Sequence, residues 1–325
     1  MGKVDTLKDN TVAIVREQNI EDMVDEVFAL LKPKLGQSQT CIVKPNLCAL
    51  KKASTGATTH PELVEALVNR IRDHCSNVLI VESNSSALEA EAKFKFCGYH
   101  EVAKQTGAKL VNLTKEDRIP VRLEHAGMVI DLPEILFDCN YILSVPTLKT
   151  HCLTVFTANI KNAYGLIPFP HKTAFHSKVN EVIADLHLVI QTKPTLCVVD
   201  GIVGMEGNGP IKGTPVHFRT VIAGEDPLIV DAACCYAMGI NPNKVKHLRL
   251  CAKYEGRRVP EINQIKAIGE ELESVRKNFV SAPTRPPFHT WLRESVMGLG
   301  PASYILDRTL YPIIRYYREK TIKAR

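Results

Sequence analysis

Short apolar runs alternate with longer amphipathic segments along most of this chain. Residues 20–35, 63–75 and 179–190 place apolar side chains three or four positions apart, which predicts helices, and 226–238 is a fourth predicted helix. This alternation of strand and helix favours an α/β fold with a mostly parallel open sheet and helices on both faces. The apolar runs predict strands at 11–15, 40–43, 78–81, 109–112, 141–145, 195–199 and 220–223, and residues 121–130 predict a hairpin-like excursion around Gly127.

The compact part of the chain is expected to end near residue 281, because prolines crowd residues 283–287. We predict a single α/β domain over residues 1–281, or two lobes that meet near 145–165. Residues 282–325 form a basic aromatic C-terminal extension with eight basic side chains against three acidic ones. Its expected role is a membrane-surface anchor through 288–325, a dimerisation arm, or packing on its own domain.

Charge and cysteine usage narrow the class of protein. The net charge is +6 over 325 residues, and the extension carries most of it, so the nearly neutral body predicts no nucleic-acid partner. No apolar run reaches the roughly 18 residues that span a bilayer. The ten cysteines contain no Cys-x-x-Cys pair, which indicates a reduced cytoplasmic protein without a self-contained iron–sulfur cluster.

Polar residues follow four of the predicted strands. Lys44 and Asn46 follow the strand predicted at 40–43, and Glu82 follows the strand at 78–81. Lys149 and His151 come after the strand at 141–145, and Asp200 comes directly after the strand at 195–199. Parallel strands bring their carboxyl ends to one edge of an open sheet, where such folds bind ligands. We therefore expect a small-molecule site at this edge.

A glycine-rich acidic segment spans residues 200–213. Gly207, Gly209 and Gly213 allow the backbone to approach a ligand closely, and Asp200 and Glu206 stand at the beginning and middle of the segment. The alternative interpretation is a long structural turn. Asp200 and Glu206 could also form an acid/base pair if burial raises the pKa of one of them.

Several lysines are expected near this edge, which favours an anionic ligand. The predicted substrate-binding residues are Lys44, Asn46, Thr58, Thr59, Lys161, Asn162, Gly207, Gly209 and Gly213. The alternative is that the lysines are solvated or paired with Glu82 and Asp231.

Four residues are the predicted catalytic groups. Lys149 binds the anion, His151 and Glu206 move protons, and Asp200 orients His151 or a metal ion. His151 and His176 are candidate metal ligands, while hydrogen-bonded core histidines are the alternative.

Six motifs stand out along the chain: Lys-Pro-Asn at 44–46, Thr-Thr-His-Pro at 58–61, Pro-x-Leu-Lys-Thr-His at 146–151, Lys-Asn-x-x-Gly at 161–165, Asp-Gly-x-x-Gly-Met-Glu-Gly-Asn-Gly-Pro-x-x-Gly at 200–213 and Asp-Pro-Leu-Ile-Val-Asp at 226–231. Together these motifs resemble the family known as domain of unknown function 362, over roughly residues 10–275. Some members of that family carry ferredoxin-type iron–sulfur modules, which implies redox metabolism; this chain lacks such a cysteine cluster, so an external electron-transfer protein would be needed. The layout is also similar to the lactate racemase family, whose members use a nickel-pincer cofactor.

The sequence therefore predicts an enzyme that acts on a small anionic metabolite by acid/base or redox chemistry. Three alternatives stay open: a non-catalytic small-molecule or cofactor-binding protein, a nickel-dependent racemase-like enzyme, and an assembly factor at a membrane surface. The expected partners are the anionic metabolite, an external electron carrier and a second copy of the chain. The expected location is the cytoplasm, and the alternative is a peripheral position at a membrane surface.

Overall fold

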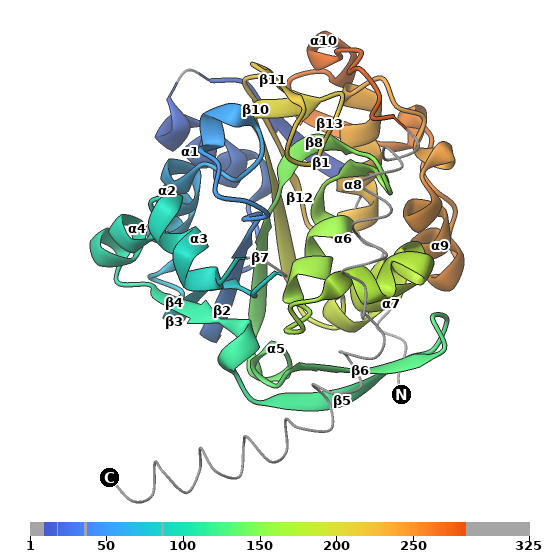
Figure 1. Cartoon of the computed structure of the whole chain (residues 1–325). Helices are drawn as coiled ribbons and strands as arrows, with labels where there is room; N and C mark the ends of the chain where they lie inside the picture. Colours follow the sequence, from blue (N-terminus) through green and yellow to red (C-terminus); the bar gives the residue numbers. More distant parts are fainter. Residues whose placement is uncertain (1–9, 18, 36–37, 86–87, 284–325) are drawn as a thin grey trace, which may run out of the picture.

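One large sheet runs through the middle of the molecule (Figure 1). The computed structural model describes residues 10–17, 19–35, 38–85 and 88–283, so the extension predicted over 282–325 lies almost wholly outside the described residues. The main path of the sheet runs β13-β1-β12-β10-β7-β2-β3-β4. These strands are β1 (Thr11–Val15), β2 (Ser38–Pro45), β3 (Cys75–Glu82), β4 (Lys109–Asn112), β7 (Tyr141–Val145), β10 (Thr195–Glu206), β12 (Thr220–Gly224) and β13 (Lys266–Gly269).

Neighbouring strands of the path are parallel except at β12, which is antiparallel to both β1 and β10. The prediction of a mostly parallel open sheet is thus confirmed. Three short strands extend the sheet beside β10, namely β8 (Thr147–His151), β9 (Val155–Thr157) and β11 (Thr214–Val216). The predicted hairpin is present as β5 (Arg118–Leu123) and β6 (Met128–Pro133), which pair only with each other.

Helices cover both faces of the sheet, as predicted (Figure 1). On one face lie α1 (Ile20–Leu31), α2 (Pro61–Ile71), α3 (Ala90–Phe96) and α4 (Tyr99–Thr106); the other carries α6 (Asn159–Asn162), α7 (Val179–Ile190), α8 (Pro227–Ala237) and α9 (Lys246–Tyr254). The remaining described helices are α5 (Ile135–Asp138), α10 (Leu272–Val275), and the 3₁₀ turns η1 (Ala53–Thr55), η2 (Leu113–Lys115), η3 (Ala163–Leu166), η4 (Lys172–Lys178), η5 (Pro242–Lys244) and η6 (Ile262–Gln264).

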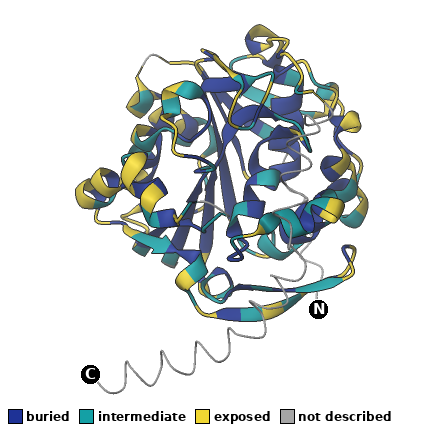
Figure 2. Ribbon diagram, viewed as in Figure 1, coloured by how far each residue is buried: buried dark blue, intermediate teal, exposed yellow. Residues whose placement is uncertain are grey.

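The period of two along each strand divides the apolar core between these two faces. Ile42 of β2 lies in register with Ile142 and Leu79, and all three pack on the α7–α9 side. Val43, one residue later, packs on the α1–α4 side instead. The strands are therefore buried from both directions, while the outward faces of the helices are exposed (Figure 2).

Three predicted elements have different ends. The first helix stops at Leu31 rather than at residue 35, because Lys32 adopts a left-handed conformation with φ of 46°. The second helix begins at Pro61 and ends at Ile71, whereas the sequence predicts it over 63–75. The strand predicted to end at residue 199 continues to Glu206, since Asp200 to Glu206 pair with β12, β8 and β11.

Candidate functional site

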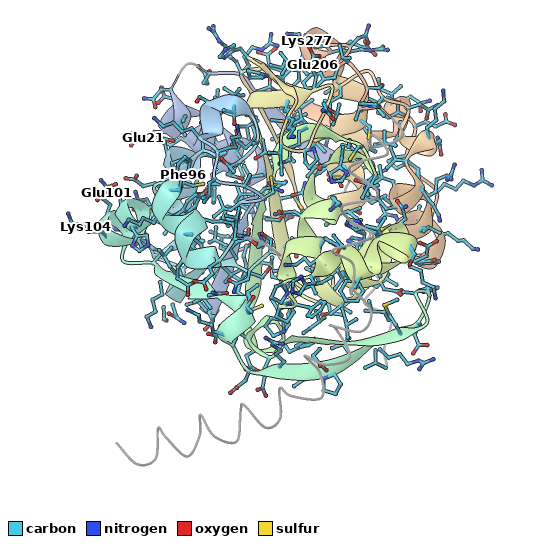
Figure 3. All side chains as sticks on the ribbon, viewed as in Figure 1. Glu21, Phe96, Glu101, Lys104, Glu206 and Lys277 are labelled. Carbon is cyan, nitrogen blue, oxygen red and sulfur yellow. The ribbon has the colours of Figure 1, made fainter. Side chains whose placement is uncertain are left out.

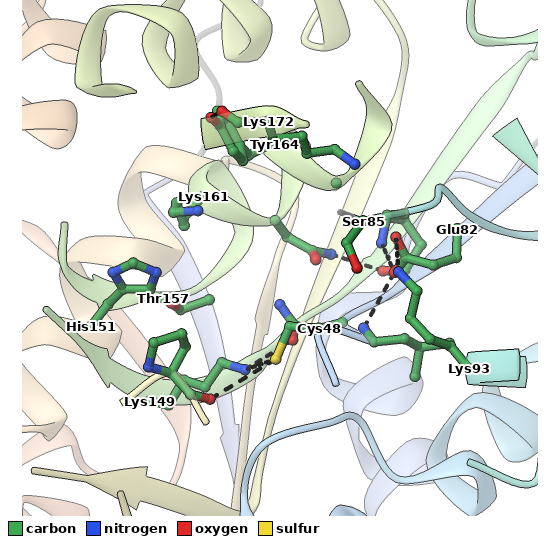
Figure 4. A pocket seen from close by; sticks show the side chains of 16 residues that line it. Cys48, Glu82, Ser85, Lys93, Lys149, His151, Thr157, Lys161, Tyr164 and Lys172 are labelled. Carbon is green, nitrogen blue, oxygen red and sulfur yellow. Dashed lines mark hydrogen bonds and ion pairs between the residues drawn. The ribbon is translucent and has the colours of Figure 1, made fainter. Parts of the chain in front are cut away.

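A cavity of about 160 Å³ opens at the carboxyl ends of β2 and β3 (Figure 4). A single water needs roughly 10–15 Å³ on this measure, so the cavity has room for a small organic ligand. We call it the lysine cavity. It is lined by Lys44, Asn46, Leu47, Cys48, Glu82, Ser85, Lys93, Lys149, His151, Thr157, Lys161, Asn162, Tyr164, Gly165, Lys172 and Pro210.

Five lysines and a single carboxylate face this cavity. Glu82 ends β3 and is buried, with one oxygen 2.9 Å from Lys44 Nζ and the other 3.7 Å from Lys93 Nζ. Its oxygens also accept backbone N–H groups of Ser83 and Leu47 at 2.9 and 3.3 Å. Burial acts to raise the pKa of Glu82, but Lys44 and Lys93 outweigh it and hold that pKa below its usual range. Glu82 is thus an ionised partner for two of the five lysines.

Lys149 is held by neutral partners. Its ammonium donates to Asn46 Oδ1 at 2.9 Å, to the Ala57 carbonyl at 2.5 Å and to Cys48 Sγ at 3.2 Å. These contacts use all three of its N–H groups. Lys149 therefore fixes the loop that follows β2 and contributes a buried positive charge to the cavity.

Lys161 and Lys172 carry the least satisfied charges. Lys172 Nζ donates to Ser83 Oγ at 2.9 Å and to the Asn84 carbonyl at 2.6 Å. Lys161 Nζ has no hydrogen-bond acceptor among the described residues and lies 4.4 Å from the centre of the Tyr164 ring. Burial lowers the pKa of Lys172 to about 7, and burial together with the charge of Lys149 lowers the pKa of Lys161 to about 8.

His151 is a neutral hydrogen-bond donor in this arrangement. Its Nδ1 accepts the backbone N–H of Leu153 at 3.1 Å, which assigns the remaining proton to Nε2. Burial and the charges of Lys161 and Lys149 hold the pKa of His151 well below its usual range. Figure 4 shows Lys161 between His151 and Tyr164, and the charge of Lys161 acts on His151, so the two side chains belong to the same part of the cavity.

Six of the predicted site residues line the lysine cavity. The loop after β2, strand β8 and helix α6 bring them together at the predicted edge of the sheet. They are Lys44, Asn46, Lys149, His151, Lys161 and Asn162.

Thr58 and Thr59 lie behind the cavity wall. Thr59 Oγ1 donates to the Val145 carbonyl at 2.7 Å and accepts the Asn46 backbone N–H at 2.9 Å. Thr58 Oγ1 donates to the Lys51 carbonyl at 2.9 Å. Both hydroxyls are therefore engaged in fixing loops and do not contribute to the cavity lining.

Asp200 is also placed away from the cavity. It lies inside β10, fully buried, and its carboxylate accepts the backbone N–H and faces Nδ1 of His60, both at 2.8 Å. Desolvation acts to lower the pKa of His60, but Asp200 outweighs it and raises that pKa above the usual range. Asp200 thus joins the sheet to the start of α2, and the predicted contact with His151 is absent from the described hydrogen bonds.

Glu206 and the glycines of 207–213 have backbone roles. Glu206 lies at the periphery (Figure 3), where its carboxylate accepts the Val280 N–H at 2.9 Å. A Cβ on Gly209 would approach the Thr150 carbonyl oxygen to 2.0 Å, and one on Gly213 would approach the Glu206 carbonyl oxygen to 2.3 Å. These glycines permit close packing of protein backbone, and from this segment only Pro210 lines the cavity.

His176 does not line the cavity. Burial and the charge of Lys161 lower the pKa of His176 to about 4. Among the described residues, no group of three or more His, Cys, Asp and Glu side chains could hold a metal ion. The metal role predicted for His151 and His176 therefore gains no further ligand from this part of the chain.

Sequence reasoning did not place Lys93 and Lys172 at the site. Lys93 lies in α3 and Lys172 begins η4, and neither follows a predicted strand. Only the packing of these elements over the carboxyl ends of β2 and β3 brings them to the cavity. Cys48 was identifiable, since it stands two residues after Asn46.

Comparisons with known proteins give a family, one curated relative and two distantly similar solved structures. The model of a domain of unknown function, DUF362, matches residues 41–236. The thylakoid-associated protein sll1697 of Synechocystis sp. is 22% identical over 256 residues, which cover 71% of this chain and 75% of that protein. In the described part of the chain, no helix is both long and apolar enough to cross a membrane.

Two solved structures are distantly similar. A Thermotoga maritima protein matches 68% of this chain at 11% identity and a TM-score of 0.38. The lactate racemase apoprotein of Thermoanaerobacterium thermosaccharolyticum matches 71% of this chain at 8% identity and a TM-score of 0.43. In each case the match spans 57% of the solved chain.

Proposed function

This chain belongs to the DUF362 family, and we propose that it is an enzyme that binds a small carboxylate or phosphate in the lysine cavity and moves a proton on it. The observation that carries the proposal is the Lys161 ammonium, which has no hydrogen-bond acceptor among the described residues and belongs to a cavity lined by five lysines. An anionic ligand would supply the missing acceptor and offset the excess of positive charge.

The five lysines differ in how many of their N–H groups are already used by protein contacts, and this difference supports the proposal. Lys149 is saturated by its three neutral contacts, and Lys44 and Lys93 are tied to Glu82. Within the described part of the chain, Lys44, Lys93 and Lys172 each keep at least one N–H group unused, whereas Lys161 keeps all three. Lys161 and Lys172, which have no ion-pair partner among the described residues, would touch the ligand, and the other lysines would act through their charge.

Proton transfer follows from where these groups titrate. A pKa near neutrality is what a general base or acid needs at physiological pH, and Lys161 and Lys172 have pKa values of about 8 and about 7. His151, neutral with its proton on Nε2, would donate a hydrogen bond to a ligand oxygen. We assign the proton transfer to Lys161 in place of His151 and Glu206.

Binding of oxalate and of inorganic phosphate, measured by calorimetry, tests the site. Lys161→Met should weaken the tighter of the two by about tenfold to a hundredfold, as expected for losing a charged hydrogen bond of roughly 1.5–3 kcal/mol. The matched control is Lys104→Met on the exposed surface of α4 (Figure 3), which should leave the affinity unchanged. If neither oxalate nor phosphate binds, the site is refuted.

Proton exchange separates an enzyme from a carrier. Incubation with the protein in D₂O should replace C–H by C–D at C2 of small 2-hydroxy acids or at C3 of small 2-oxo acids, and NMR follows this exchange. A carrier that uses the same cavity would bind the acids and leave every C–H intact.

A membrane-peripheral location is a separate proposal. Its support is the printed name of the Synechocystis relative, which describes that protein as thylakoid-associated, and the basic aromatic composition of 284–325. A chain truncated after Ala282 should lose sedimentation with anionic vesicles. Equal sedimentation of the truncated and full chains would remove this proposal.

A further inference from the structure

We propose that the Lys161 amine forms an imine with the carbonyl carbon of a small 2-oxo acid held in the lysine cavity. This inference rests on the proposed anion site and names its substrate class and its covalent step. It depends on which lysine of the cavity can give up its N–H groups without loss to the fold.

An imine nitrogen carries at most one hydrogen, so a lysine that forms one loses N–H donors. Imine formation at Lys149 would leave at least two of its three partners, Asn46, Ala57 and Cys48, without a donor. At Lys172 it would break at least one of the two bonds to Ser83 and Asn84. Each buried acceptor left without a donor costs roughly 1–3 kcal/mol.

Lys44 and Lys93 are less suited than Lys161, because their N–H groups already serve Glu82 and the backbone. Each is an ion-pair partner of the buried Glu82, and each also donates to a backbone carbonyl. Conversion to an imine would weaken both kinds of contact. Lys161 breaks no hydrogen bond that the described residues make, and it alone among the five is free to turn toward a carbonyl carbon.

The surroundings of Lys161 also favour a nucleophilic amine. Burial and the nearby charge of Lys149 bring its pKa to about 8, against smaller opposing effects of Cys48 and Cys152. A lysine desolvated beside a second cation is the arrangement that activates an amine for attack on a carbonyl. The Tyr164 ring 4.4 Å away offers one wall for the substrate carbon chain.

The step balances without any further reactant. The neutral Lys161 nitrogen adds to the carbonyl carbon and gives a carbinolamine, whose hydroxyl leaves as water once the amine proton has been transferred to it. His151, which lines the same cavity and carries its proton on Nε2, would donate a hydrogen bond to that oxygen, and the remaining cations would hold the carboxylate. The protonated imine then withdraws electrons from the neighbouring carbon and makes its C–H acidic. Because Lys161 is the imine nitrogen in this route, Lys172 would accept that proton in its place.

Reductive trapping on the full chain tests this inference. The protein is incubated with pyruvate and borohydride at pH 8, and the modified peptide is identified by mass spectrometry. We expect one reduced pyruvyl adduct on Lys161, abolished in Lys161→Arg and retained in Lys104→Arg. Excess oxalate, which has no ketone, should suppress the adduct by occupying the cavity.

The outcomes separate the two proposals. Oxalate binding without a Lys161 adduct would overturn the imine and leave the anion site standing. Absence of binding by both oxalate and phosphate would overturn the site itself. An adduct mapped to Lys172, or spread over surface lysines and insensitive to oxalate, would also overturn the assignment, and this mapping on the unmodified sequence does not depend on whether a variant folds.

Discussion

Replacement of Glu82 by Gln is the sharpest test of how the lysine cavity is held together. Glu82 is 4% exposed, and its two partners Lys44 and Lys93 are 3% and 2% exposed. Gln keeps the size of the side chain and removes the charge, so two buried ammonium groups lose their only carboxylate among the cavity-lining residues. Removing one partner of a buried pair costs about 3–5 kcal/mol.

We therefore expect Glu82→Gln to lower the free energy of unfolding by about 3–5 kcal/mol in urea titrations at pH 7. The melting temperature should fall by roughly 10 °C, since 1 kcal/mol corresponds to about 2–4 °C for a large domain. Glu101→Gln on the exposed face of α4 is the matched control and should change stability by less than about 0.5 kcal/mol (Figure 3).

The lowered pKa of Glu82 determines how the effect of Glu82→Gln on stability changes with pH. The pKa of Glu82 in the folded chain is lowered from its usual 4.5, so its stabilising contribution is present above that pH and is lost as the pH falls through the lower folded value. The difference between Glu82→Gln and the native chain should accordingly shrink at low pH. A loss below about 1 kcal/mol at pH 7 would refute the reasoning, because it would mean that the two lysines are hydrated or neutral without Glu82.

Three further predictions follow from the same contacts. Asp200→Asn should destabilise the fold by about 3–5 kcal/mol in urea, as a broken buried pair does, and leave the oxalate Kd unchanged; a selective loss of binding would restore its catalytic role. Gly209→Ala should lower the melting temperature more than Gly207→Ala. A Cβ at position 209 would meet a carbonyl oxygen at 2.0 Å, whereas a Cβ at position 207 has open space. Only the φ of 71° opposes a side chain at position 207, at a cost of about 1–2 kcal/mol. Oxalate affinity should fall between pH 6.5 and 9.5, because deprotonation of Lys172 near 7 and of Lys161 near 8 removes the charges that attract the anion; a calorimetric Kd that is flat across this range would contradict both roles.

The fold was largely predictable because its signals are local. Runs such as 78–81 and 195–199 are continuously apolar because strands of a sheet covered on both faces are buried from both sides. The errors arose where pairing partners are distant. Nothing near Asp200 in the sequence indicates that β10 continues for six more residues, since the strands that pair with this part of β10 come from 147–151 and 214–224.

The candidate site was predictable to the extent that it follows strand ends. Lys44 lies at the end of β2 and Asn46 follows it, and Lys149 and His151 lie in β8 just after β7, so the geometry of a parallel sheet brings them together. The sequence predicts that the glycine-rich segment approaches a ligand, but Gly209 and Gly213 instead pack closely against neighbouring backbone. Glycine permits close approach of any group, and the sequence does not say which group approaches.

By itself, the sequence determined the two-sided sheet, its helices and the edge at which a cationic site would form. The tertiary structure alone decided which charges are satisfied. Glu82 neutralises Lys44 and Lys93, and Lys149 is saturated by its loop, whereas Lys161 is left with no acceptor among the described residues. Hydrophobic periodicity is written in neighbouring positions, but the partner of a buried charge is set by elements far apart in the chain, and that partner decides which lysine remains available for chemistry.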